Sequence, residues 1–245
     1  MLELHTCYLS ETGGRQRNED ACGYWSADHA GCWIVSDGAG GHGSGDVASR
    51  LVVTTVLKRF QAAPQVGSES AAELLQAAQD AVMQEKCGAT RRNDMHATAA
   101  ILLVDVRQEL AVWGHVGDSR IYLFRSGRLL CRTRDHSLVQ QMMDAGLAGG
   151  DATREHPKRS ILTSAIGSAG DLSLAVAEPI RLLPGDRFLI CSDGWWEHVL
   201  DDEMQTPGPE LPERWLERMA ELIRERAPSG NDNYTAIAIE VSEAD

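Results

Sequence analysis

The stretch Trp33-Ile-Val-Ser-Asp-Gly-Ala-Gly-Gly-His-Gly-Ser-Gly45 joins an apolar run to a glycine-rich loop. The run from Trp33 to Val35 is typical of a buried strand, and Asp37 follows it where the loop begins. Gly38 tolerates a positive φ, so its carbonyl can turn toward a ligand. A carboxylate and an open carbonyl oxygen are therefore expected side by side. Such a pair suits a hard cation, which prefers oxygen ligands.

The same stretch has a simpler explanation, in which Asp37 is solvated in an ordinary strand-to-helix turn. An isolated glycine-rich loop is weak evidence for any function. The residues after the loop predict a helix as far as Phe60, because apolar side chains recur on one face at helical spacing. These side chains are Val47, Ala48, Leu51, Val52, Thr55 and Val56.

The composition of the 245-residue chain excludes several classes of protein. With 43% hydrophobic and 24% charged residues, it is typical of a globular protein with a sizeable core. The net charge of −13 argues against a nucleic acid or an anionic membrane as the main partner. Six cysteines without a CxxC pair indicate reduced thiols, and no signal peptide or membrane-spanning run is recognisable. We expect a cytoplasmic protein and, in addition, a monomer.

Hydrophobic periodicity outlines the expected elements. Strands are expected at Leu2–Leu9, Gly23–Ser26, Gly31–Val35, Thr98–Asp105, Leu110–Val116, Ile121–Arg125, Arg128–Arg132, Leu172–Val176, Phe188–Cys191 and Tyr234–Val241. Helices are expected from the glycine loop to Phe60 and at Ala71–Lys86, Ser137–Ala145, Trp195–Leu200 and Pro212–Arg226. Strands interleaved with a few long helices, without regular βαβ repetition, predict an α+β fold with an antiparallel sheet core. No linker divides residues 1–245, so we expect one domain, with residues 133–170 as a flap inserted beside the sheet.

Acidic residues stand beside glycine or asparagine where four predicted strands begin or end. The loops are Ser36-Asp37-Gly38, Val116-Gly117-Asp118-Ser119, Cys191-Ser192-Asp193-Gly194 and Gly230-Asn231-Asp232-Asn233, with Glu19-Asp20 as a fifth candidate. If these loops meet at one edge of a sandwich, cations or protons must neutralise their like charges. The pattern therefore predicts a clustered metal site, although aspartate beside glycine is also ordinary turn composition.

Five segments, in this order, resemble the metal-dependent protein phosphatases of type 2C in their compact bacterial form. They are Arg15-Gln-Arg-Asn-Glu-Asp20, Asp37-Gly-Ala-Gly-Gly-His-Gly, Gly117-Asp-Ser-Arg120, Ser192-Asp-Gly-Trp195 and Asp232-Asn-Tyr-Thr235. The resemblance runs from about Thr12 to Val241, nearly the whole chain. It implies a central β-sandwich flanked by helix pairs, in four αββα layers. It also implies hydrolysis of phosphoserine and phosphothreonine in proteins with Mn²⁺ or Mg²⁺.

The resemblance also implies a set of metal ligands. The implied ligands are Asp37, the Gly38 carbonyl, Asp193, Asp232, Glu19, Asp20 and Asp118. Asp37 would bridge two ions, and Glu19 and Asp20 would act partly through water. Asp118 would serve, with Asp193, a third and weaker ion.

The resemblance further implies residues that act on the substrate. Arg15 matches the arginine that binds phosphate. Some members carry a histidine directly after the Asp-Gly pair as a proposed general acid, but Ala39 stands there in this chain. His42 matches the histidine of the bacterial version, and it either donates a proton or only supports the loop.

The chemistry of phosphate esters favours a metal centre independently. Hydrolysis of a phosphate monoester needs up to ~10²¹-fold acceleration, roughly 29 kcal/mol, and one general base supplies only about 10²–10⁴-fold. Two metal ions can activate and orient a water, and an arginine can grip the phosphoryl oxygens. The chain contains no Cys-x5-Arg loop, which disfavours a cysteine phosphatase.

Several residues have plainer interpretations. Arg17 and Arg120 are expected at the surface or in salt bridges near the site, and Trp195 and Trp196 in the core or anchoring a lid. His96, in a segment where the family usually has small or hydroxyl residues, receives no catalytic role.

We expect phosphoproteins as substrates, an opposing serine/threonine kinase and a flap that contributes to substrate choice. The rivals are the related phosphatases of anti-sigma-factor antagonists and a pseudophosphatase. The second rival is disfavoured because the chain retains Arg15, Asp37, Asp193 and Asp232.

Overall fold

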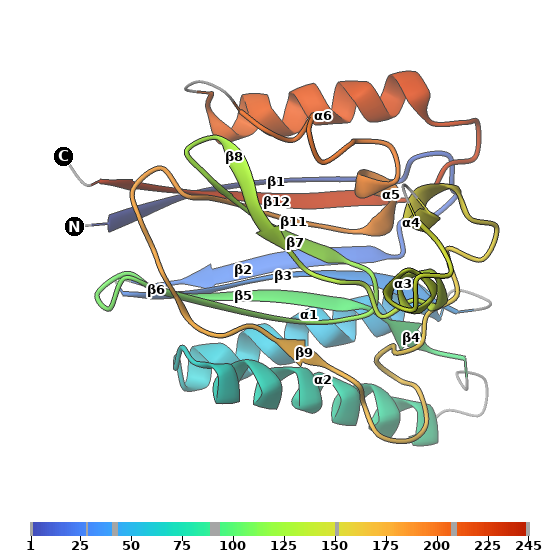
Figure 1. Ribbon diagram of the computed structural model, residues 1–245. Helices are drawn as coiled ribbons and strands as arrows, with labels where there is room; N and C mark the ends of the chain where they lie inside the picture. Colours follow the sequence, from blue (N-terminus) through green and yellow to red (C-terminus); the bar gives the residue numbers. More distant parts are fainter. Residues whose placement is uncertain are drawn as a thin grey trace.

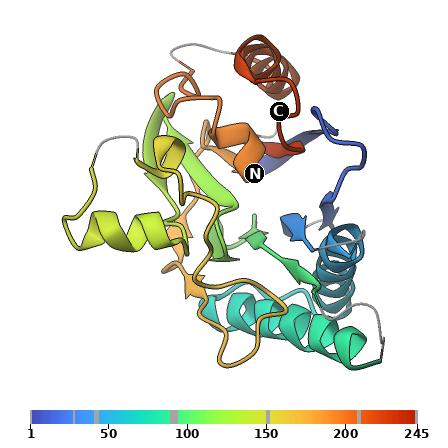
Figure 2. The same cartoon turned by 90° about the vertical axis from the view of Figure 1, so that its right-hand side faces the viewer.

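The computed structural model describes residues 2–27, 29–40, 44–88, 94–149, 152–206 and 210–243. Two antiparallel sheets lie face to face at its centre, with helices on the outer side of each (Figure 1). Seen from the side, α6 forms the top layer, α1 and α2 form the bottom layer, and the flap with α3 stands to the left (Figure 2).

The two sheets differ in size and connection. One has the order β1-β12-β11-β7-β8, with bounds Leu2–Glu11, Tyr234–Glu243, Arg187–Cys191, Arg120–Arg125 and Arg128–Arg132. The other has the order β10-β6-β5-β3-β2, with bounds Ile180–Arg181, Leu110–Val116, Ala99–Asp105, Ala30–Ala39 and Asp20–Ser26. Two short strands extend this second sheet, β4 (His96–Ala97) beside β3 and β9 (Ala175–Val176) beside β6.

The helices complete the layers. Helices α1 (Gly45–Ala62) and α2 (Ser68–Gly88) cover the second sheet, and α6 (Pro212–Arg226) covers the first together with the short α5 (Asp193–Trp196). None of the helices in the described ranges combines the length and apolar character needed to cross a membrane.

Alternation along the strands divides the core into three apolar layers. In β3, Cys32 and Ile34 pack with α1 and α2, whereas Trp33 and Val35 pack between the sheets. In β12, Ile237 lies in the layer between the sheets, and Ala236 lies under α6. A one-residue change of register would exchange these faces, so burial on both sides specifies the pairing strongly.

The antiparallel order brings many strand ends to one edge of the sandwich, at the right of Figure 1. Strand β2 begins at Asp20, which pairs with Asp37 near the end of β3. Strand β11 ends at Cys191, which pairs with Arg120 at the start of β7 and with Ala236 near the start of β12. The loops that carry the predicted acidic residues therefore open at the same edge.

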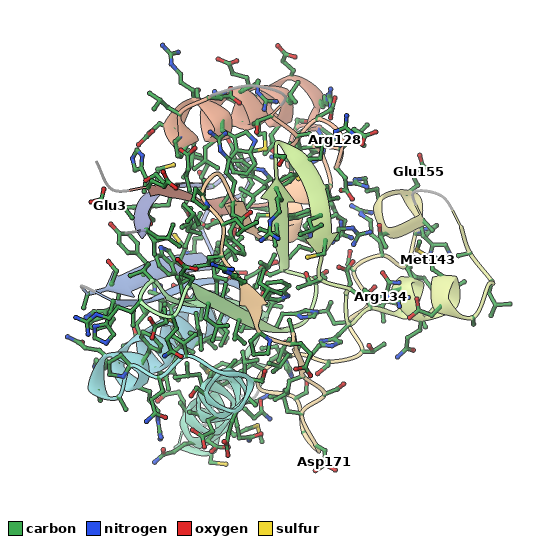
Figure 3. The ribbon with its side chains drawn as sticks, turned by 60° about the vertical axis from the view of Figure 1, so that its left-hand side comes forward. Glu3, Arg128, Arg134, Met143, Glu155 and Asp171 are labelled. Atoms are coloured by element: carbon green, nitrogen blue, oxygen red, sulfur yellow. The ribbon has the colours of Figure 1, made fainter. Side chains whose placement is uncertain are left out.

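The flap lies beside this edge. It contains α3 (Leu138–Asp144), which Ser137 caps by accepting a hydrogen bond from the backbone N–H of Gln140, and the single turn α4 (Ala152–Glu155). Figure 3 shows Met143 and Glu155 on these two helices, which project away from the sandwich. The flap rests on a rigid scaffold, as loops that carry specificity commonly do.

The predicted α+β sandwich is confirmed, and most predicted elements are present within a few residues. The turn at Ser126-Gly127 has positive φ at both residues, as a tight hairpin requires. Three local expectations are wrong. Strand β10 is missing from the prediction, the flap contains the short helix α4 that the prediction lacks, and Leu172–Val176 forms a strand only in its last two residues. Such short elements depend on contacts with distant strands, so local sequence indicates them poorly.

The layer between the sheets offers a test of the fold. Ile237 is completely buried there, so Ile237→Ala is expected to lower the free energy of unfolding by about 2–5 kcal/mol through lost burial and a cavity. Leu130→Ala is the control, since Leu130 is 55% exposed on β8, and a change within about 0.5 kcal/mol is expected. Urea denaturation measures the free energy of unfolding of both variants. An equal decrease in the two would contradict the assignment of Ile237 to the core and of Leu130 to the surface.

Candidate metal centre

A cleft of about 300 Å³ opens at the edge where the strand ends meet. Most of the predicted site residues line it, namely Arg15, Glu19, Asp37, Gly38, Asp118, Asp193 and Asp232. Asp20 lies buried behind this lining, and His42 lies outside the described residues. The flap contributes Ser160 and Leu162 to the lining. The structure thus brings together acidic residues that are up to about two hundred positions apart in the chain.

Asp37 and Gly38 belong to the last part of β3 rather than to the loop after it, which corrects the expectation from the sequence. Two pairings explain the difference, because Asp37 pairs with Asp20 of β2 and Gly38 pairs with Ala97 of β4. Thr98 then fixes Asp37: its Oγ1 accepts a hydrogen bond from the Asp37 N–H at 2.9 Å, and its own N–H donates to the Asp37 carbonyl at 2.8 Å.

Glycine at position 38 serves close approach rather than a positive φ. A Cβ at this position would lie 2.1 Å from the carbonyl oxygen of Gly45 and 2.7 Å from that of Glu19. The Gly38 N–H donates to the same Glu19 carbonyl at 3.1 Å. Gly38 therefore lets the start of α1 and the loop before β2 approach Asp37.

Asp20 is held by residues of the opposite sheet. Ser192 Oγ donates a hydrogen bond to Asp20 Oδ2 at 2.7 Å and accepts one from the Thr235 N–H at 3.0 Å. Burial raises the pKa of the Asp20 carboxyl to about 6, although the hydrogen bond from Ser192 opposes the change. Asp20 and Asp37, neighbours across β2 and β3, are thus fixed from two sides.

Asp193 and Asp118 enter the cleft from two further segments: Asp193 follows β11 of the other sheet, and Asp118 lies in the loop that joins β6 to β7. Asp193 is the first residue of α5, and its Oδ1 is buried without a hydrogen-bond partner among the described residues. Burial raises the pKa of Asp193 well above its usual value, and the charge of Asp118 raises it further. Burial, with Asp135 nearby, raises the pKa of Asp118 to about 7. These carboxyls resist ionisation until a positive charge joins them.

The donor set fits a hard divalent cation. The pKa of Asp37 is raised by burial first and then by the charges of Asp20 and Asp193, so several carboxylates repel one another across this cleft. Divalent ions that prefer oxygen ligands would relieve this repulsion and would satisfy the unpartnered Asp193 oxygen. In the described part of the chain, no three acidic, histidine or cysteine side chains form a ready metal cage. Carboxylate and carbonyl oxygens are the ligands that Mg²⁺-like ions prefer, and such ions also keep several waters.

Arg15 lies at the mouth of the cleft. Its Nη2 donates to Asp232 Oδ2 at 2.8 Å, and the two side chains are 55% and 42% exposed. An ion pair that is so exposed stabilises the fold by only about 0–1 kcal/mol. The guanidinium is therefore available to another anion in the cleft.

Arg120 is completely buried in a salt bridge with Asp135, which is the second of the two places expected for it from the sequence. It makes two hydrogen bonds with Asp135, at 2.8 and 2.7 Å, and its guanidinium stacks 3.5 Å from the centre of the Trp196 ring. The Trp196 Nε1–H donates to the Asp118 carbonyl at 2.9 Å. Trp195 and Trp196 are buried, as predicted for core residues.

Sequence reasoning missed the residues that support the acidic side chains. Thr98, Ser192 and Asn233 bind backbone or carboxylate groups of the cleft through side-chain hydrogen bonds. Two of them, Ser192 and Asn233, stand directly beside a predicted ligand, and that adjacency was the available signal. His96 also lines the cleft, with its Nε2 3.5 Å from Lys86 Nζ.

A larger cavity of about 410 Å³ lies beside the flap. Its lining includes the stacked rings of His115 and His136, 4.6 Å apart. Burial lowers the pKa of His136 to about 4, and its Nδ1 accepts a hydrogen bond from the Gly117 N–H at 3.2 Å. None of the predicted site residues lines this cavity, so we place the chemistry in the smaller acidic cleft.

Comparison with known proteins agrees with the motifs in this cleft. Residues 10–233 match the family model described as protein phosphatase 2C. The chain belongs to this family. A relative from Listeria monocytogenes, the serine/threonine phosphatase stp, is 29% identical, and the match covers 97% of this chain and 96% of the relative.

Two solved structures extend the comparison. The catalytic domain of the phosphatase PstP in complex with two manganese ions is 27% identical, with a TM-score of 0.80 over 99% of this chain and 100% of that one. PppA of Pseudomonas aeruginosa, described as a key regulatory component of T6SS, is 31% identical, with a TM-score of 0.79 over 97% of each chain. The protein is a metal-dependent serine/threonine protein phosphatase of bacterial type.

The raised pKa values predict how stability depends on pH when metal is removed. The folded protein holds a proton on Asp118 up to a pKa of about 7, whereas the unfolded chain releases it near the usual aspartate pKa of 3.8. The folded state therefore binds more protons in this window, so its free energy of unfolding falls as pH rises. In EDTA, the free energy of unfolding is expected to fall between about pH 5 and about pH 7.5. The fall should be larger in the wild type than in Asp118→Asn by about 1–3 kcal/mol.

Urea denaturation at the two pH values measures this difference. Saturating Mn²⁺ is the control, because bound cations favour the charged carboxylates and should weaken or reverse the slope. The same slope for wild type and Asp118→Asn in EDTA would show that Asp118 does not hold the proton.

Proposed function

We propose that this enzyme removes phosphate from serine and threonine residues of proteins at the acidic cleft, with a Mn²⁺ or Mg²⁺ centre of two ions and a weaker third. The observation that carries the proposal is the convergence of Asp37, Asp118, Asp193 and Asp232 on one cleft that Arg15 also lines. These residues come from separate segments of the chain, and their carboxylates repel one another without cations. The repulsion destabilises the fold when no metal is bound, which supports the proposal that the active enzyme binds cations here.

The carboxylate and carbonyl oxygens of the cleft are the ligands that we assign to the metal ions. Asp37 would hold two of the ions, because it lies within the field of several other acidic groups. Asp193, Asp232 and the Gly38 carbonyl complete the protein ligands around it, and Asp118 shares the weaker ion with Asp193. Glu19 and Asp20 act on the remaining side, partly through water. When bound, such ions lower the pKa of water and neutralise charge on phosphoryl oxygens.

Arg15 is assigned to hold the phosphoryl group. Its guanidinium can bind two phosphoryl oxygens at once, after it exchanges its exposed pairing with Asp232 for the substrate. A water oxygen then attacks phosphorus directly, and the bond from phosphorus to the serine or threonine oxygen breaks. That leaving oxygen takes up a proton, for which His42 remains our candidate donor.

The wider setting follows from the same proposal. We propose that residues 1–245 form one domain, with the flap at about 133–170 contributing to substrate choice because Ser160 and Leu162 line the cleft. We also propose that the protein acts as a cytoplasmic monomer and that a serine/threonine kinase phosphorylates its substrates.

Chelation tests the metal centre. Treatment with EDTA is expected to abolish hydrolysis of p-nitrophenyl phosphate, and Mn²⁺ or Mg²⁺ should restore it. Asp37→Asn is expected to lower kcat by about 10²-fold or more even with metal, because a neutral amide cannot bridge two cations as a carboxylate does. A folded protein without activity under any metal would favour a pseudophosphatase, and activity indifferent to EDTA would refute the metal roles.

Arg15→Ala tests the phosphate site. Charge-assisted hydrogen bonds of this kind contribute about 1.5–3 kcal/mol, so KM for a phosphothreonine peptide is expected to rise roughly 10-fold or more. Arg17→Ala is the matched control, because Arg17 is exposed on the same loop and does not line the cleft. Equal effects of the two substitutions would show that only the charge of the loop matters.

A further inference from the structure

Two loops meet at the mouth of the cleft. The arginine loop, residues 12–19, carries Arg15, and the aspartate loop, residues 227–233, carries Asp232. Their backbones touch, because the Gly14 N–H donates to the Asn231 carbonyl at 3.0 Å. A Cβ on Gly13 would lie 2.2 Å from the Asp232 carbonyl oxygen. Position 13 therefore requires glycine, because any side chain there would collide with the aspartate loop.

The side chain of Asn233 joins the two loops at three points. Its Nδ2 donates to the carbonyls of Thr12 and Arg17, each at 2.9 Å. Its Oδ1 accepts a hydrogen bond from the Glu19 N–H at 2.8 Å. Carbonyls only accept and a backbone N–H only donates, so this set of partners fixes the orientation of the amide.

These three contacts surround Arg15 in the chain. Thr12 and Arg17 flank it on either side, and Glu19 ends the loop. Asn233 is only 4% exposed, so water cannot easily replace its amide. Its own N–H also donates to Asp232 Oδ1 at 2.9 Å, on the carboxylate that pairs with Arg15.

We propose that Asn233 is a positioning residue that holds the arginine loop, and through it Arg15, at the place where phosphate binds. The proposal rests on the function proposed above, in which Arg15 binds the phosphoryl group. Asn233 does not itself need to touch the substrate. Without its amide, the loop moves more freely, and phosphate binding must then order the arginine that the native structure holds ready.

A double-mutant cycle separates this role from general support of the fold. The variants are Arg15→Ala, Asn233→Ala, the double variant and, as control, Asn231→Ala. Asn231 is the neighbour on the same loop, and its side chain donates only a 3.3 Å hydrogen bond to the Asp232 carbonyl among the described contacts. For each protein, kcat and KM for a phosphothreonine peptide and the Ki of inorganic phosphate are measured in saturating Mn²⁺.

If Asn233 acts through Arg15, Asn233→Ala raises KM and the phosphate Ki about fivefold or more when Arg15 is present, with a smaller change in kcat. In the Arg15→Ala background the same substitution changes both values by less than about twofold, because the group it positions is already absent. Asn231→Ala leaves all values near those of the wild type.

Two results would overturn the inference in distinguishable ways. Equal effects of Asn233→Ala with and without Arg15 would show that Asn233 supports the fold rather than Arg15. No change of KM or Ki in Arg15→Ala itself would refute the phosphate role of Arg15, and so the proposed function on which the inference rests. If circular dichroism shows that Asn233→Ala does not fold, Asn233→Asp replaces it in the cycle, since it keeps the shape and the acceptor but loses both donors.

Discussion

Mutual repulsion among buried carboxylates is the constraint that shapes the working edge of this protein. Asp37 and Asp193 are enclosed, and each lies within the field of several other acidic groups. Burial alone disfavours their charged forms, and the neighbouring charges add to the cost. The rest of the sandwich must therefore hold them in place against a force that separates them, until cations offset it.

Hydrogen bonds from neighbouring strands provide that hold. Thr98, between β4 and β5, binds the backbone of Asp37, and its hydroxyl also lies 2.6 Å from that of Ser119, beside Asp118. Ser192, between β11 and α5, reaches Asp20. Asp37 and Asp20 are thus each held by a residue at the end of a strand, so the stiffness of the packed sheets is transmitted to the acidic cleft. Preorganisation of this kind lets a site bind ions without rearranging.

The flap stands apart from this rigid edge but remains joined to it. Arg159 makes two hydrogen bonds with Glu197, at the end of α5, while Arg154 donates to the Trp196 carbonyl at 2.9 Å. The helix that begins with Asp193 is therefore held at its far end by the flap. Residues of the flap therefore help to fix the helix that supplies Asp193 to the cleft.

Alternating strands, amphipathic helices and turn residues are local patterns, so the amino-acid sequence was enough to predict an α+β fold with an antiparallel sheet core. The central sandwich flanked by helix pairs followed from the resemblance of the motifs to the phosphatase family. The acidic motifs also stood out, since Asp37-Gly38, Asp193-Gly194 and Asp232-Asn233 are short and contiguous. What only the tertiary structure decided is how these segments are held together. Pairing with Asp20 of β2 places Asp37 inside a strand, and Asn233 joins loops more than two hundred residues apart. Such contacts depend on strand register and buried hydrogen bonds between distant segments, and no local pattern in the chain encodes them.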